Sequence, residues 1–171
     1  MSMSYLLVLG EREALAWVLR EGRMAFPATR RHEVDRLAVG DELFLLTTRG
    51  CFHNPVRDRT RVIGRAVVST RVEPLDPPLE LVGRRFTRGC KLDIGVLAPY
   101  RTGVEVAPLV PKLDAFPRKD VWSIWLRRPL VSLGQHDVNL IWSRLRRVGR
   151  PVSEHLPTYL ESIRPVAAPG R

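Results

Sequence analysis

Residues 40–69 predict two apolar strands joined by a long loop, and this arrangement constrains the fold more than any other stretch. Gly40-Asp41 is a turn signal, and residues 42–48 are rich in Leu, Phe and Thr, as strands are. Residues 62–69 form a second apolar run, with Ile63 and Val67 on one face. Hairpin loops usually have about 2–5 residues, so residues 49–61 are more than a connection requires. We therefore predict that this loop is the rim of a binding site.

The chemistry of the loop favours a polyanionic partner. Four arginines (Arg49, Arg57, Arg59 and Arg61) face a single acid, Asp58. A base held outside a helix needs an aromatic face, polar groups for its edge and arginines for the flanking phosphates. We predict phosphate binding by the four loop arginines and by Arg30.

Two tryptophans extend the predicted site. Residues 121–126 are expected to form a strand, in which Trp122 and Trp125 would face opposite sides, so that at most one of them is core. The alternative is that both pack at sheet edges. The complete set of predicted ligand-binding residues is Phe26, Thr47, Thr48, Phe52, Asn54, Trp122 and Trp125.

Composition agrees with a nucleic-acid partner, DNA or RNA. The 171 residues include 28 Lys and Arg against 18 Asp and Glu, which gives a formal net charge of +10. Nearly all of the positively charged residues are arginines. Arginine forks onto phosphate and stacks on bases better than lysine does. The plainer alternative is that arginine-rich composition reflects a GC-rich genome. Apolar residues make up 44% of the chain, enough for a core, and we expect one domain at 1–149 with a partly disordered arm at 150–171.

Enzyme and metal signatures are absent from the sequence. It has no P-loop, dinucleotide-binding glycine pattern, G-x-S-x-G or H-E-x-x-H motif. Cys51, His53 and Cys90 lack the C-x2-C spacing typical of zinc. We expect no catalytic residue, metal or cofactor. We also expect no membrane span and no signal peptide, and hence a cytoplasmic protein.

The order of the predicted elements indicates an α+β fold. A buried strand at 5–9 leads into a helix at 11–21 and a short helix at 30–38, and several short strands follow. An amphipathic helix at 135–148 closes the domain. Because strands and helices do not alternate, we expect a bent or barrel-like sheet with helices at its edges.

This succession resembles the EVE domain of the PUA-like superfamily. The resemblance is carried by Gly40-Asp41 before a strand ending in LLTTRG, by VIGRAVVS at 62–69, and by Trp122, Arg128-Pro129-Leu130 and the final helix, over about residues 5–147. It implies a PUA-like bent β-barrel of five to six short strands with flanking helices, and a pocket between the barrel and the first helices.

The resemblance also implies a function. Related pockets of EVE and YTH domains hold a flipped, commonly methylated base. The family often has Trp and Ser where this sequence has Leu6-Leu7 and Leu9-Gly10, so the stacking group would come from Phe26 or Trp125. Two alternatives stay open: an RNA-acting enzyme like the related ASCH domains, using Lys91, His53 or Tyr100, and a protein-interaction scaffold.

Overall fold

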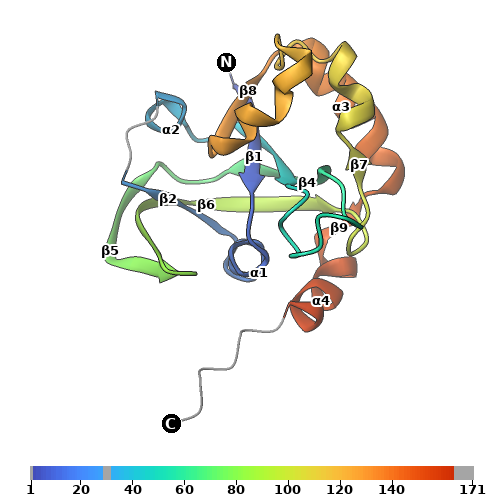
Figure 1. Cartoon of the computed structure of the whole chain (residues 1–171). Coiled ribbons are helices and arrows are strands. Elements are labelled where there is room, and N and C mark those ends of the chain that lie inside the picture. The colour runs from blue at the N-terminus through green and yellow to red at the C-terminus, as the bar shows by residue number, and fades with distance from the viewer. Residues whose placement is uncertain (1, 29–31, 164–171) are drawn as a thin grey trace.

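A strongly curled β-sheet forms the centre of the computed structural model, which describes residues 2–28 and 32–163 (Figure 1). The strand order is β2-β6-β4-β3-β1-β8; β5 and β9 also pair with β6, and β7 with β4. All pairings are antiparallel except β1 with β3. The strands are β1 (Ser4–Leu9), β2 (Arg23–Pro27), β3 (Glu42–Thr47), β4 (Arg61–Val68), β5 (Glu73–Leu81), β6 (Arg84–Leu97), β7 (Val104–Glu105), β8 (Leu130–Leu133) and β9 (Arg150–Pro151).

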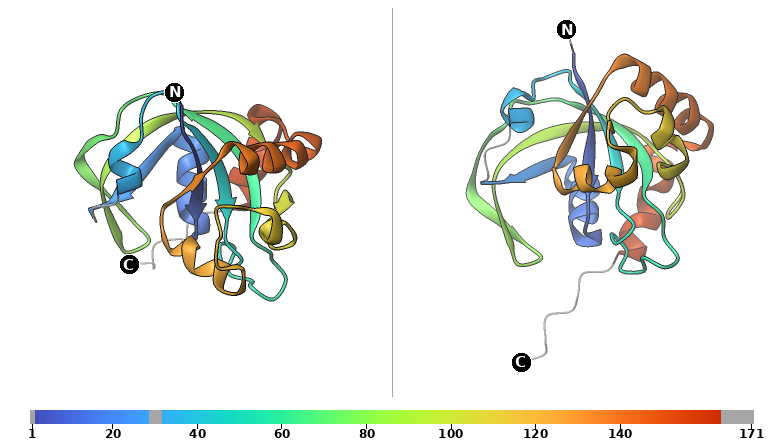
Figure 2. Two further views of the ribbon diagram at one scale, coloured as in Figure 1. Left: turned by 90° about the horizontal axis from the view of Figure 1, so that it is seen from above. Right: turned by 45° about the horizontal axis from the view of Figure 1, so that its top comes forward.

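Helices lie around the curled sheet, as the predicted α+β class requires (Figure 2). They are α1 (Arg12–Glu21), α2 (His32–Arg36), α3 (Gln135–Val148) and α4 (Val152–Ser162), with the 3₁₀ segments η1 (Ala107–Lys112) and η2 (Lys119–Arg127). The prediction of a bent sheet with flanking helices is confirmed. None of the helices within 2–28 and 32–163 combines the length and the apolar character that a bilayer crossing needs.

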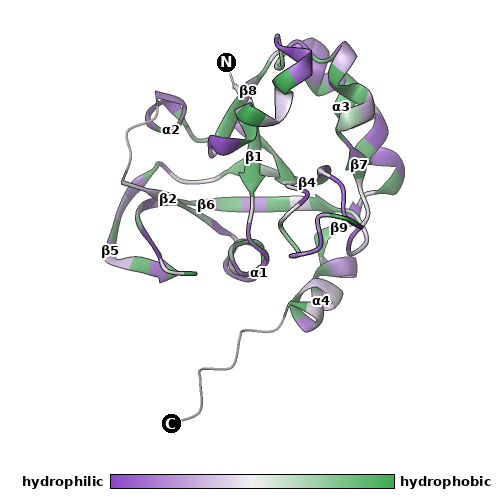
Figure 3. Cartoon of the chain, in the orientation of Figure 1, coloured by the Kyte–Doolittle hydropathy of each residue, from purple (hydrophilic) through white to green (hydrophobic). Residues whose placement is uncertain are grey.

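The central strands are apolar throughout because both faces of the sheet are covered. Leu7 of β1 and Leu45 of β3 belong to one core cluster, whereas Leu6 and Phe44 belong to another. Successive strand residues point to opposite faces, so each cluster receives alternate side chains. The hydropathy colouring shows apolar residues on the sheet strands and many polar residues on α3 and α1 (Figure 3).

The Gly40-Asp41 pair has a larger role than a turn. Gly40 has a φ of 92°, which favours glycine. The Asp41 carboxylate is 3% exposed and accepts hydrogen bonds from the backbone N–H groups of Met3 and Ala38, both at 2.9 Å. This side chain therefore joins the start of β1 to the entry of β3.

Residues 121–126 do not form the predicted strand. They lie in η2, and a 3₁₀ helix has three residues per turn, so Trp122 and Trp125 share a face. Both pack against the second core cluster, and Trp122 meets Phe116 edge to face with centroids 5.6 Å apart. Residues three apart lie on opposite faces of a strand but on the same face of a 3₁₀ helix. The prediction that the two tryptophans face opposite sides is therefore wrong.

The C-terminal segment is also more ordered than expected. Residues 152–162 form α4, and Tyr159 is fully buried in the first core cluster, where its hydroxyl donates to the Ala98 carbonyl at 2.9 Å. In this part the structure therefore differs from the expected arm, because one aromatic side chain anchors the helix to the sheet. Residues 164–171 lie outside the described residues, and the predicted domain boundary at 149 stays a prediction.

Candidate functional site

A cavity of about 530 Å³ opens where β1 ends and α1 begins. One wall comes from these two elements and from β2, and the β5–β6 hairpin forms a second wall. The end of η2 and the residues that follow it form the third. The lining residues are Val8, Leu9, Gly10, Glu11, Ala14, Met24, Ala25, Pro27, Leu81, Val82, Arg84, Phe86, Leu126, Arg127, Arg128 and Pro129. The cavity therefore lies between the sheet and the first helix, where the resemblance implies a pocket.

The walls are mostly apolar, and the local sequence explains their shape. Gly10 ends the apolar strand β1 and carries no side chain into the gap before α1. Ala14, in the first turn of α1, has a small side chain that leaves room in the cavity. A second apolar hollow of about 30 Å³, lined by Ala14, Trp17 and Leu79 among others, continues under the hairpin. Phe86 is the one aromatic residue that lines the main cavity within the described part of the chain.

Arginines from two separate elements flank the cavity. Arg84, on the hairpin, is exposed and its guanidinium lies 5.8 Å from the Phe86 ring centroid. Arg127, at the end of η2, is exposed as well. Neither forms an ion pair with an acid among the described residues. Arg128 is held in place, because it stacks over Trp125 at 4.6 Å and pairs with Glu33 at 3.5 Å.

The arginine-bearing loop at 49–61 lies on the other side of α1 from the β5–β6 hairpin (Figure 1). None of its residues lines the cavity. Phe52 is half-buried and meets Tyr100 edge to face at 5.5 Å, so its ring packs against the core instead of lying free for a base. His53 contacts α1, with its Nε2 3.2 Å from Glu11 Oε2. The loop is therefore packed against the rest of the fold, whereas the sequence predicted a binding-site rim.

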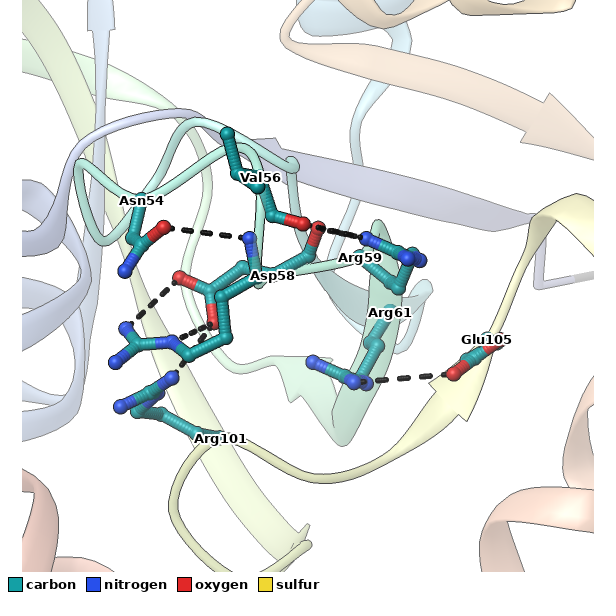
Figure 4. Close-up of polar contacts among 8 residues, drawn as sticks. Asn54, Val56, Asp58, Arg59, Arg61, Arg101 and Glu105 are labelled. Carbon is teal, nitrogen blue, oxygen red and sulfur yellow. Dashed lines mark hydrogen bonds and ion pairs between the residues drawn. The ribbon is translucent and has the colours of Figure 1, made fainter.

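Several polar groups of the loop bind one another or residues 101 and 105 outside it (Figure 4). Asp58 is 2% exposed and accepts hydrogen bonds from Arg57 at 3.2 Å and from Arg101 at 2.9 Å. Arg59 donates to the backbone carbonyls of Val56 and Asp58, and Arg61 lies 3.8 Å from Glu105. Asp58 and Glu105 therefore offset part of the loop's positive charge, whereas Arg49, Arg57 and Arg59 stay exposed at the surface.

The remaining predicted residues lie in several places. Phe26 is fully buried in the core, and Thr47 is 2% exposed, so neither offers a surface to a ligand. The Asn54 side chain accepts a hydrogen bond from the Arg57 backbone N–H at 3.2 Å. Thr48 is half-buried next to Gly10 without lining the cavity, Arg49 is exposed, and Arg30 lies outside the described residues. The structure does not gather the predicted set around one cavity.

The residues suggested for an RNA-acting enzyme do not meet at the cavity either. His53 is paired with Glu11, and Tyr100 packs between Phe52 and Tyr159 with centroids 5.5 and 5.2 Å away. Lys91 is exposed, where β6 pairs with the start of β2. None of the three lines the cavity.

The loop also buries Cys51, which predicts an unreactive thiol. Burial raises the pKa of Cys51 to about 12 and that of Cys90 to about 11, so neither is a thiolate at pH 8. We expect iodoacetamide at pH 8 to modify both far more slowly than a free thiol, with Cys51 the slower of the two. Mass spectrometry of time points, with a guanidinium-unfolded sample as control, measures this. Modification of Cys51 at the rate of the unfolded chain would contradict the packed loop.

Known proteins resemble this chain in fold, at low sequence identity. No family model matches this chain, and no curated protein does. Solved structures match most of it: a Pseudomonas syringae protein (TM-score 0.54, 13% identity, 82% of this chain and 97% of that one); human THYN1 in complex with 5-methylcytosine-containing DNA (0.54, 11%, 83% and 96%); and the Mmi1 YTH domain in complex with RNA (0.54, 12%, 87% and 84%). The fold is PUA-like. The predicted fold class is confirmed, and the cavity belongs to a fold shared with THYN1 and with the Mmi1 YTH domain.

Proposed function

We propose that this protein binds nucleic acid and holds one base, flipped out of its stack, in the cavity beside α1. The observation that carries the proposal is the pairing of a mostly apolar cavity of about 530 Å³ with exposed arginines on two of its walls. Ligand pockets usually have volumes of about 300–1,000 Å³ and apolar walls with a few polar groups. THYN1 and Mmi1, which share the fold, have structures in complex with methylated DNA and with RNA.

Each part of the cavity suits one part of a nucleotide. Leu9, Ala14 and Met24 provide apolar surface for the faces of a base, and Phe86 provides one aromatic ring for stacking. Arg84 and Arg127 stand on different elements, so they can contact the phosphates on the two sides of that base. We place the protein in the EVE branch of the fold, with a plain or modified base as its ligand.

Filling the cavity should weaken base binding without unfolding the protein. Ala14 is half-buried on α1 and lines the cavity, so Ala14→Phe places a ring in the space of the base. We expect this variant to weaken binding of a short single-stranded oligonucleotide by about 10-fold or more, since base stacking is worth about 1–3 kcal/mol. Fluorescence anisotropy with matched DNA and RNA, unmodified or carrying 5-methylcytosine, measures the loss.

Ala14→Ser is the control, because it changes the same position and leaves the cavity open. It should bind as the wild type does, and both variants should keep the wild-type thermal midpoint within a few degrees. If the wild type and Ala14→Phe bound the oligonucleotide equally well, the base would not be held in this cavity. Absence of binding to every oligonucleotide at low salt would overturn the proposed function itself.

A further inference from the structure

The turn of the β5–β6 hairpin holds a valine in an unfavourable conformation. Leu81 pairs with Arg84, so Val82 and Gly83 are the two central residues of the turn. Their φ values are 53° and 68°, both positive, as in a type I′ turn. Such turns favour Asn-Gly, and a β-branched residue with positive φ is a genuine outlier. Val82 therefore holds a backbone conformation that is unfavourable for valine.

Packing within the chain does not account for this valine. Val82 is 47% exposed, and open space surrounds its neighbour, since a Cβ built on Gly83 would meet nothing within 4 Å. A strained residue usually persists where function needs it. Because the side chain is not buried by the fold, its use is better sought in a partner.

The tip lies at the cavity, and its surroundings are basic. Val82 and Leu81 both line the cavity, together with Arg84. Arg85 follows and is exposed, with only a long contact of 3.9 Å to the exposed Glu80. The hairpin therefore presents an apolar residue at its tip, followed by two exposed arginines, beside the space proposed for a base.

We infer that the hairpin tip inserts Val82 into the base stack of a double helix, at the position left by the base that enters the cavity. Proteins that distort duplexes insert apolar side chains between bases in this way, with arginines on the adjacent phosphates. The inference rests on the proposed function and deepens it, because it makes the ligand a duplex. A single strand has no stack to hold open, so it can bind without the wedge.

Val82→Asn tests this inference without risk to the fold. Asparagine suits a positive φ, so the variant should be more stable, with a thermal midpoint about 2–4 °C higher. We expect its affinity for a short duplex to fall about 10-fold, because the wedge that supports the opened stack is lost. Its affinity for the matching single strand should fall much less, because Val82 is only one of the residues that line the cavity. Anisotropy at one salt concentration gives both affinities.

Val56→Asn is the matched control, because Val56 is 88% exposed and lies in the loop at 49–61, away from the cavity. It should change neither affinity. Unchanged duplex binding by Val82→Asn, or equal loss for duplex and single strand, would overturn the wedge while leaving the proposed function intact. No binding of either ligand by the wild type would instead remove the proposed function.

Discussion

Replacement of both Arg84 and Arg127 by alanine is expected to weaken oligonucleotide binding about 100-fold or more at moderate salt, because hydrogen bonds to charged groups are worth about 1.5–3 kcal/mol each. Both side chains are exposed, flank the cavity and form no ion pair within the described part of the chain. Loss of two phosphate contacts should also reduce the slope of log affinity against log salt by about 2. Anisotropy at several salt concentrations measures both effects.

A charge-matched double variant in the loop, Arg49→Ala with Arg59→Ala, is the control. It removes the same formal charge from the region that the sequence singled out. Arg59 already donates to the carbonyls of Val56 and Asp58, so we expect a smaller loss of affinity. If the loop variant lost more affinity than the variant at Arg84 and Arg127, the phosphates would bind at the loop and not beside the cavity.

Tyr159→Ala is expected to destabilise the protein by about 3–5 kcal/mol, the usual cost of deleting a buried aromatic ring. The ring is fully buried and meets Tyr100 edge to face at 5.2 Å. It anchors α4 to the sheet, and its loss should release that helix. Chemical denaturation gives the free energy of unfolding.

Tyr159→Phe separates the ring from its hydroxyl. This variant keeps the packing and loses the hydrogen bond to the Ala98 carbonyl, so we expect a cost of about 1 kcal/mol. If Tyr159→Ala cost no more than Tyr159→Phe, the C-terminal helix would not be part of the folded domain, and the predicted arm would stand.

Local patterns in the sequence predicted most of the elements. The apolar stripe of α3 fixed its bounds at Gln135–Val148, as observed, and the strands at 42–48 and 62–69 correspond to β3 and β4 within one residue at each end. Period and turn residues decide these elements, and neighbours in sequence carry both signals.

Long-range pairing explains what the sequence could not predict. Arg57 and Arg61 read as free charges, yet the fold brings Arg101 to share Asp58 with Arg57 and places Glu105 beside Arg61. The cavity is likewise assembled from β1, α1, β2, the hairpin and η2. The resemblance implied a pocket between the barrel and the first helices, but no local pattern marked Phe86 or Arg84 as its walls.

We expect nucleic acid to bind at the cavity beside α1 and not at the loop at 49–61. Titration of the ¹⁵N-labelled protein with a short oligonucleotide tests this most directly, because each backbone amide reports its own surroundings. Binding at the cavity should give the largest shift changes at Gly10, Ala14, Val82 and Phe86, with small changes over residues 49–61. Changes confined to the loop, with the cavity amides unmoved, would contradict it.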